Sequence, residues 1–197
     1  MTSFDESSPS IILASASPRR SELLRQVGVR FRVVVTDVDE SVRPGEEPGA
    51  YVLRVARDKA LEARRRERGA LPVLAADTAV VLDGCILGKP VSRAEAADML
   101  SRLAGRTHEV YSGVALTGGA GAVDERLNIS RVTFAPLDSA WIEAYIATGD
   151  PLDKAGAYGV QGRAAEKIVR IEGSFSGVMG LPLFETCDLL RRAEVLS

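Results

Sequence analysis

Residues 15–20, SASPRR, combine hydroxyl groups with two adjacent arginines. The apolar run before them is typical of a buried strand, and Ser17 followed by Pro18 suits the cap and the first turn of a helix. A helix N-terminus offers free backbone N–H groups and the positive end of the helix dipole, and guanidinium groups bind phosphate oxygens. The segment therefore favours phosphate binding, with an ordinary cap followed by surface arginines as the alternative.

Carboxylates gather in residues 36–40, TDVDE, at the end of an apolar segment. Carboxylate oxygens are natural ligands for Mg²⁺, although acidic strand ends are also common on protein surfaces. Alternation along a regular strand puts Asp37 and Asp39 on one side and their neighbours on the other. Only part of this acidic group can therefore face one ligand.

Asp77 and Thr78 interrupt the apolar run of residues 71–82. A carboxylate in an apolar strand is costly unless it is paired or binds a metal, so a structural aspartate with satisfied hydrogen bonds is one interpretation of Asp77. The other is a proton acceptor in a hydrolytic site. In that role, either the surroundings must make the carboxylate more basic or a metal ion must make the attacking water more acidic.

Three lysines follow or precede these motifs: Lys59, Lys89 and Lys154. Each could neutralise a phosphate, although a solvated surface lysine is the simpler interpretation. The sequence LGKP around Lys89 lacks the flanking glycine and hydroxyl of a P-loop, which argues against that class of NTPase. The single histidine, His108, has no serine or cysteine nucleophile motif around it, so we expect it to be structural.

Hydrophobic periodicity places these residues on alternating strands and helices. A hairpin turn is expected at Asp83-Gly84, a capping box at Ser92 and Glu95, and a glycine-rich loop at residues 149–162. The expected strands are residues 11–15, 31–40, 71–82, 85–88, 107–118 and 125–136, the last two joined by the turn GGAGA. The expected helices are residues 18–27, 50–68, 92–103, 138–146 and 183–195.

The composition of the 197 residues fits one globular domain, residues 1–197, with a polar arm at residues 1–10. A formal net charge of -2 gives no field for a polyanion, so we expect no nucleic-acid partner. The basic run at residues 64–68 complements the end of a helix. Two cysteines without metal-ligand spacing, and no segment resembling an export signal or a membrane span, predict a protein of the cytoplasm.

Seven segments, in order and in spacing, resemble the Maf family from about Ile11 to Leu190: LASASPRRSELL, VDE, AADT, LGKP, GRTHEVYSGVAL, DPLDKAGAYGVQG and GLPL. The resemblance implies an α/β fold with a long mixed β-sheet, flanking helices and two lobes around a central cleft, like that of inosine triphosphate pyrophosphatases. It implies cleavage of a nucleoside triphosphate between its α and β phosphorus atoms, with a divalent cation, Mg²⁺ or Mn²⁺. A homodimer is also consistent with it.

Residue by residue, the resemblance makes Asp77 the proton acceptor, and Glu40, Lys59 and Lys89 polar residues of the cleft. We expect Glu40 and Asp77 to hold the metal ion, and Arg20, Lys59 and Lys89 to bind the triphosphate. The resemblance further makes Arg19, Thr78 and Gln161 the positions that select the base.

These three residues resemble the subgroup that acts on dTTP and UTP, because an arginine and an amide can meet the carbonyl groups and N3 of a uracil ring. The subgroup that acts on 7-methyl-GTP carries tryptophan, glutamine and glutamate instead. One departure from the family pattern is GSFSGVMGLPL, with Ser176 and Gly177 in place of a bulky residue and asparagine.

The family has also been credited with a role in cell-division arrest, so the alternative to an enzyme is a nucleotide-binding regulator of septum formation. A phosphatase that releases orthophosphate is the alternative within enzymes.

Overall fold

The computed structural model describes residues 8–67, 69–118 and 122–196 and is built on one seven-stranded mixed sheet. The strand order is β2-β1-β3-β5-β6-β7, and β4 pairs with β3. β2, β1 and β3 run parallel, and the other pairings are antiparallel. The strands are β1 (Ile11–Leu13), β2 (Phe31–Val33), β3 (Val73–Leu82), β4 (Cys85–Leu87), β5 (Thr107–Thr117), β6 (Val123–Phe134) and β7 (Ile168–Glu172).

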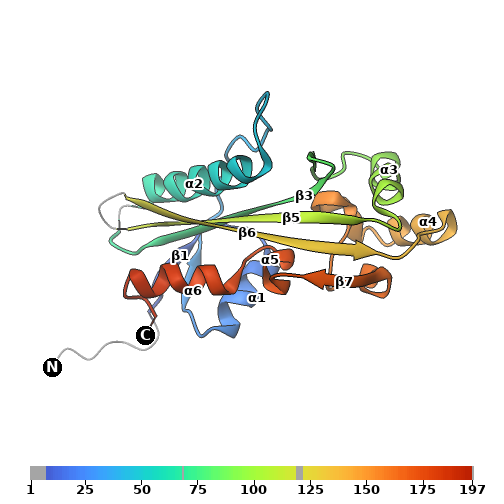
Figure 1. The fold of residues 1–197 in the computed structure, drawn as a ribbon. Helices are drawn as coiled ribbons and strands as arrows, with labels where there is room; N and C mark the ends of the chain where they lie inside the picture. The colour runs from blue at the N-terminus through green and yellow to red at the C-terminus, as the bar shows by residue number, and fades with distance from the viewer. Residues whose placement is uncertain (1–7, 68, 119–121, 197) are drawn as a thin grey trace.

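Helices cover both faces of the sheet (Figure 1). α2 (Pro48–Arg66) lies along one face over β3 and β5, and α1 (Pro18–Gln26), α5 (Phe175–Met179) and α6 (Leu183–Arg192) lie on the other. α3 (Arg93–Leu103) and α4 (Ser139–Ala147) pack together at the far end. Three short 3-10 helices follow α4: η1 (Asp150–Asp153), η2 (Ala155–Ala157) and η3 (Arg163–Lys167).

The core divides between the two ends of the sheet, which gives the predicted two lobes. At one end, α2 buries alanine and valine side chains against the strands, while leucines of α1 and α6 fill the opposite face. At the other end, Leu100, Phe134 and Tyr145 belong to a separate cluster built by α3, α4, β6 and the 3-10 helices. The long strands β3, β5 and β6 run through both lobes and join them (Figure 1).

β3 has a gap in its pairing on the side away from β5. β1 pairs with Val73 and Leu74, and β4 pairs with residues 80–82, whereas β5 pairs along residues 73–81 on the other side. The edge of β3 at residues 75–79 is therefore open between the ends of β1 and β4. Successive side chains of a strand point to opposite faces, so Asp77 and Thr78 border this gap from opposite sides of the sheet.

Most of the expected elements are confirmed, including the hairpin, whose Asp83 and Gly84 have φ of 52° and 77°, as a tight primed turn requires. The strand expected over residues 31–40 is wrong beyond Val33. Its partner β1 has three residues, and the last ladder bond runs from the backbone N–H of Val34 to the carbonyl of Leu13. Beyond that bond, residues 35–40 pair with no strand of the described residues and leave the sheet. β7 and α5 were not expected, and residues 149–162 contain η1 and η2.

Two expected caps differ from the structure. Ser17 makes no side-chain cap; instead, the Ser15 hydroxyl accepts from the Ser17 backbone N–H at 3.1 Å. Ser92 caps α3 as expected, but the carboxylate of Glu95 accepts from Val91 rather than from Ser92. Most of the N-terminal arm, Arg68 and the middle of the GGAGA turn lie outside the described residues.

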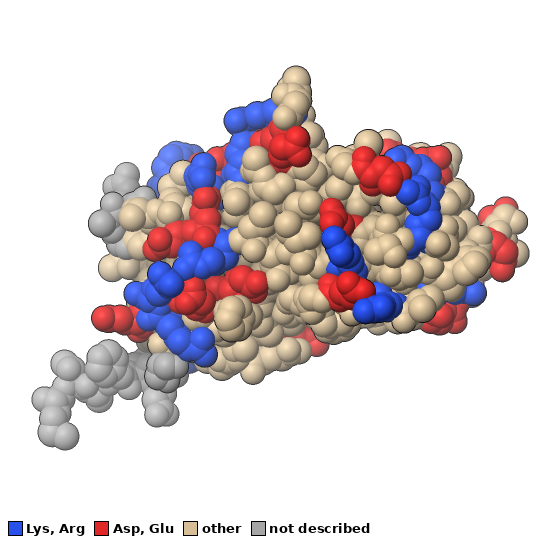
Figure 2. Space-filling model, in the orientation of Figure 1, with Lys and Arg blue, Asp and Glu red and all other residues tan. Residues whose placement is uncertain are grey.

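Charges of both signs are interspersed over the face shown in Figure 2, without a continuous field of one sign. At the end of α2, Arg65 and Arg66 both pair with Glu62, as expected for a solvated helix end. Across the described residues, every helix is too short or too polar to cross a bilayer.

Candidate active site

A cleft of about 640 Å³ opens at the gap in β3. One wall is the turn from β1 into α1, residues 14–20, and another is the segment at residues 35–42 with the inner face of α2. The floor comes from residues 77–80 of β3, and the remaining wall from β4, residues 153–160 and the end of α5. The cleft is thus assembled from segments distant in sequence, and both faces of β3 contribute to it.

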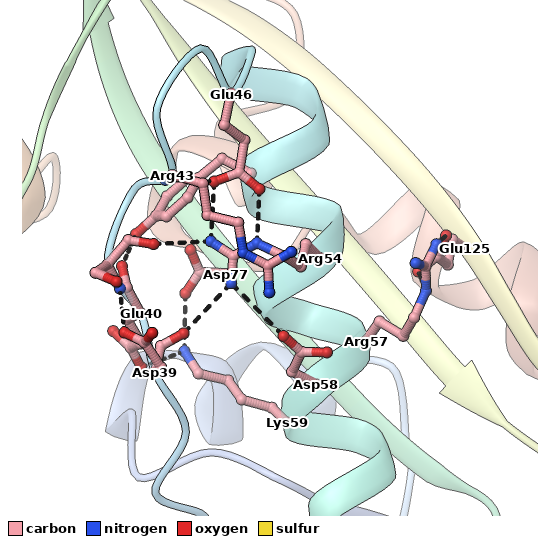
Figure 3. Close-up of polar contacts among 12 residues, drawn as sticks. Asp39, Glu40, Arg43, Glu46, Arg54, Arg57, Asp58, Lys59, Asp77 and Glu125 are labelled. Atoms are coloured by element: carbon pink, nitrogen blue, oxygen red, sulfur yellow. Dashed lines mark hydrogen bonds and ion pairs between the residues drawn. The ribbon is translucent and has the colours of Figure 1, made fainter.

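A cluster of one lysine and two carboxylates lies in this cleft (Figure 3). The Lys59 Nζ donates to Asp77 Oδ1 at 2.8 Å and lies 2.7 Å from Glu40 Oε1. Lys59 and Asp77 are buried, whereas Glu40 is partly exposed. A buried carboxylate requires such a cation nearby, so Lys59 explains how Asp77 is tolerated in an apolar strand.

Glu40 reaches this cluster because α2 holds the backbone on both sides of it. The Arg54 guanidinium donates to the carbonyls of Asp39 and Ser41 at 3.3 and 2.9 Å, and Tyr51 donates from its hydroxyl to the carbonyl of Glu40 at 3.0 Å. Burial alone would raise the pKa of the Glu40 carboxyl, but the hydrogen bond and charge of Lys59, with Lys89 and Arg20 nearby, lower it on balance. Glu40 is therefore held as a carboxylate at neutral pH.

Arg20 occupies the opposite side of the gap from Lys59. Its Nε donates to the carbonyl of Gly180 at 2.8 Å, and its two Nη atoms lie 3.3 Å from the Ser15 hydroxyl and 3.4 Å from the Thr78 hydroxyl. Burial lowers the pKa of Arg20, and the charge of Asp77 opposes that effect. Three interactions thus fix this guanidinium beside the cleft before any ligand binds.

The sequence profile of one protein family, described as Maf-like protein, matches residues 10–193. The chain belongs to the Maf family. A dTTP/UTP pyrophosphatase of Cupriavidus pinatubonensis is 53% identical over 195 residues, covering 94% of this chain and 97% of the relative. A dTTP/UTP pyrophosphatase of Methylobacillus flagellatus is 53% identical over 186 residues, covering 94% and 93%.

The Maf chain also shares its fold with a solved HAM1 protein from Coxiella burnetii. The two are 19% identical with a TM-score of 0.51, and the match covers 94% of this chain and 100% of that one. This likeness confirms the mixed α/β fold with its long sheet and flanking helices.

Most of the site residues predicted from the sequence line this same cleft: Arg19, Arg20, Glu40, Lys59, Asp77, Thr78, Lys89 and Lys154. Asp37 and Asp39 do not line it; Asp39 accepts instead from the backbone N–H of Ser41 at 2.9 Å. Gln161 is exposed. It follows Val160, which is the last residue of the loop at residues 149–162 that lines the cleft. The Lys154 Nζ is held by Asp150 and Asp153.

His108 lies in the core, as expected for a structural residue. Its Nε2 is 2.7 Å from the hydroxyl of Tyr158, its ring stacks on Phe134, and burial lowers its pKa to about 4.

Tyr51, Arg54 and Ser112 contribute to the site but are not predicted from the sequence. A sequence signal for Tyr51 does exist. The apolar face of α2 carries Tyr51, Val55 and Lys59 at intervals of four residues, which places the Tyr51 hydroxyl and the Lys59 ammonium on one side of the helix. Ser112 lies directly opposite Thr78 on β5. Only the strand register shows that contact.

The donor set of the cleft determines what metal it could hold. Among the described residues there is no group of three or more histidine, cysteine or acidic side chains placed to bind an ion. Glu40 and Asp77, however, approach the same ammonium group. Mg²⁺ is commonly bound by one or two carboxylates together with substrate phosphates. This pair fits a cation that arrives with a triphosphate, rather than one held by protein alone.

Proposed function

We propose that this Maf protein hydrolyses pyrimidine nucleoside triphosphates, dTTP and UTP, to the nucleoside monophosphate and pyrophosphate. The observation that carries the proposal is the Asp77–Lys59 pair on the floor of a cleft whose other walls supply cations and a helix N-terminus. The substrates are those named for relatives that are 53% identical over nearly the whole chain.

Asp77 orients the attacking water and accepts its proton, since it is the buried carboxylate at the open edge of β3. Lys59 donates a hydrogen bond to that carboxylate and supplies positive charge next to the reacting phosphate. Lys89 and Arg20 face the same space from other walls and stabilise charge on the triphosphate as pyrophosphate leaves.

Glu40 and Asp77 hold a divalent cation, Mg²⁺ or Mn²⁺, in this proposal. When bound, such an ion neutralises phosphate charge and makes a coordinated water more acidic. The protein contributes the spacing of the two carboxylates, which Arg54 and Tyr51 fix through the backbone around Glu40.

Arg19, Thr78 and Gln161 select the base in this proposal. Arg19 and Thr78 line the cleft, and Gln161 follows Val160 at its rim.

We further propose that the protein clears unwanted nucleotides in the cytoplasm. In this proposal it acts on free nucleotides as a homodimer, without nucleic-acid or membrane partners. The net charge of -2 and the mixed surface charge support the absence of a nucleic-acid partner, and sedimentation equilibrium tests the dimer.

A panel of nucleotides with identified products tests the proposal. With Mg²⁺ present, dTTP and UTP should give monophosphate and pyrophosphate, faster than GTP or 7-methyl-GTP. Release of orthophosphate would make the protein a phosphatase, and a preference for 7-methyl-GTP would move it to the other subgroup. Binding of nucleotides without any hydrolysis would favour a regulator of septum formation.

A further inference from the structure

A chain of hydroxyl groups leads from the cleft into the sheet behind it. The Thr78 hydroxyl lies in the cleft and is 3.1 Å from the hydroxyl of Ser112, its cross-strand partner on β5. Ser112 is fully buried and lies 2.7 Å from the carbonyl oxygen of Gly177 in α5.

The direction of these hydrogen bonds follows from the last group in the chain. A carbonyl oxygen can only accept, so the single hydroxyl proton of Ser112 is donated to Gly177. Ser112 can then only accept from Thr78. The other acceptor near Thr78, the carbonyl of Gly180, is 3.5 Å away, which is a poor hydrogen bond. The Thr78 proton therefore points away from the cleft, toward Ser112.

Thr78 consequently presents only lone pairs toward a ligand. Arg20 donates toward the same oxygen at 3.4 Å and cannot change the direction, because a guanidinium has no acceptor. Because Arg20 is assigned to the triphosphate, Thr78 is the member of this pair that is left to meet a base, and it meets the base as an acceptor.

The part of the cleft around Thr78 has apolar walls that suit a base. Lys59, Asp77 and Glu40 gather on the α2 side of the gap. On the side of Thr78, Arg20 and Ser15 are joined in the lining by Val160, Val178, Met179 and Gly180. Apolar walls with a few directed polar groups are typical of sites for flat organic rings.

We propose that Ser112 is a positioning residue that makes Thr78 a hydrogen-bond acceptor and thereby selects bases with a proton on N3. The inference rests on the proposed function, pyrimidine triphosphate hydrolysis in this cleft. Uracil and thymine carry an N–H at N3, which matches the acceptor of Thr78. Neutral cytosine has an unprotonated N3, which would face the lone pairs of Thr78.

The test compares kcat/KM for UTP and CTP in the wild type and in Ser112→Ala. Without Ser112, the Thr78 hydroxyl is free to donate to N3 of cytosine, so the UTP-to-CTP ratio should fall about tenfold or more. Thr78→Val removes the acceptor and should also lower this ratio, and it keeps the test decisive if Ser112→Ala fails to fold.

Ser130→Ala is the matched control. Ser130 is equally buried on the neighbouring strand and ties the same segment to the sheet, accepting from the backbone N–H of Ser174 at 2.9 Å. Its loss should leave the UTP-to-CTP ratio unchanged. A wild-type ratio in either folded Ser112→Ala or folded Thr78→Val, or an equal fall in Ser130→Ala, overturns the inference while the proposed function stands. A wild type that hydrolyses neither nucleotide overturns both.

Discussion

Replacing Lys59 by methionine removes the ammonium group that contacts both Glu40 and Asp77 in the cleft. Methionine keeps the length and apolar contacts of the lysine stem, so the change isolates the ammonium group. The Asp77 side chain is 9% exposed and would lose the cation 2.8 Å away, whereas the Glu40 side chain is 42% exposed and can be hydrated instead.

The loss of stability should therefore come mainly from Asp77. Removing one partner of a buried ion pair costs about 3–5 kcal/mol, and we expect the lower end, about 3 kcal/mol, because Asp77 borders the open cleft. For a domain of this size, such a loss lowers Tm by roughly 6–12 °C. The double variant Lys59→Met/Asp77→Asn removes both charges and should recover most of the stability without recovering activity.

Urea and thermal unfolding of the wild type, Lys59→Met and the double variant measure these changes in stability. Pyrophosphate release by the same three proteins is measured in parallel. Lys89→Met is the matched control, because that side chain is 63% exposed and its Nζ is 3.8 Å from Glu40; its cost should stay below about 1 kcal/mol. A loss below 1 kcal/mol in Lys59→Met, or a double variant no more stable than the single one, would refute the reasoning.

Asp77→Asn should lower turnover by about 10²- to 10⁴-fold with the fold retained, because the amide keeps the size and loses the proton acceptor; near wild-type turnover would remove Asp77 from the mechanism. The neutral form of His108 is favoured by folding, so its contribution is complete above pH 6.5 and is lost as pH falls toward 4. The difference between these pKa values corresponds to about 3 kcal/mol, and His108→Gln should flatten the pH dependence of unfolding in that window; an unchanged slope would contradict the assignment. Gly113→Ala should destabilise the protein by about 1–3 kcal/mol in urea unfolding, since the new Cβ would lie 2.7 Å from the Val52 carbonyl; full stability would show that α2 can shift.

Signals within one segment were enough to predict much of the site. Asp77 and Thr78 stand out because they interrupt an apolar strand, and the hairpin at Asp83-Gly84 follows from backbone preferences of two adjacent residues. Family resemblance was needed to place Glu40, Lys59 and Lys89 in one cleft, since these residues are brought together by tertiary packing.

Features that depend on pairing between distant segments could not be predicted in this way. The second strand ends at Val33 because β1 is short, which no property of residues 34–40 reveals. Ser112 becomes part of the site only through its register opposite Thr78 and the approach of Gly177 from α5, a helix of five residues too short to show periodicity.

Hydrolysis of UTP in water enriched in ¹⁸O, with the products analysed by mass spectrometry, tests the central claim most directly. If Asp77 directs water to the α-phosphorus and pyrophosphate leaves, the products are UMP and pyrophosphate, and the label appears in the phosphate of UMP. Label in pyrophosphate would place the attack on the β-phosphorus, and UDP with labelled orthophosphate would place it on the γ-phosphorus. Either result would contradict the proposed arrangement of the triphosphate around Asp77.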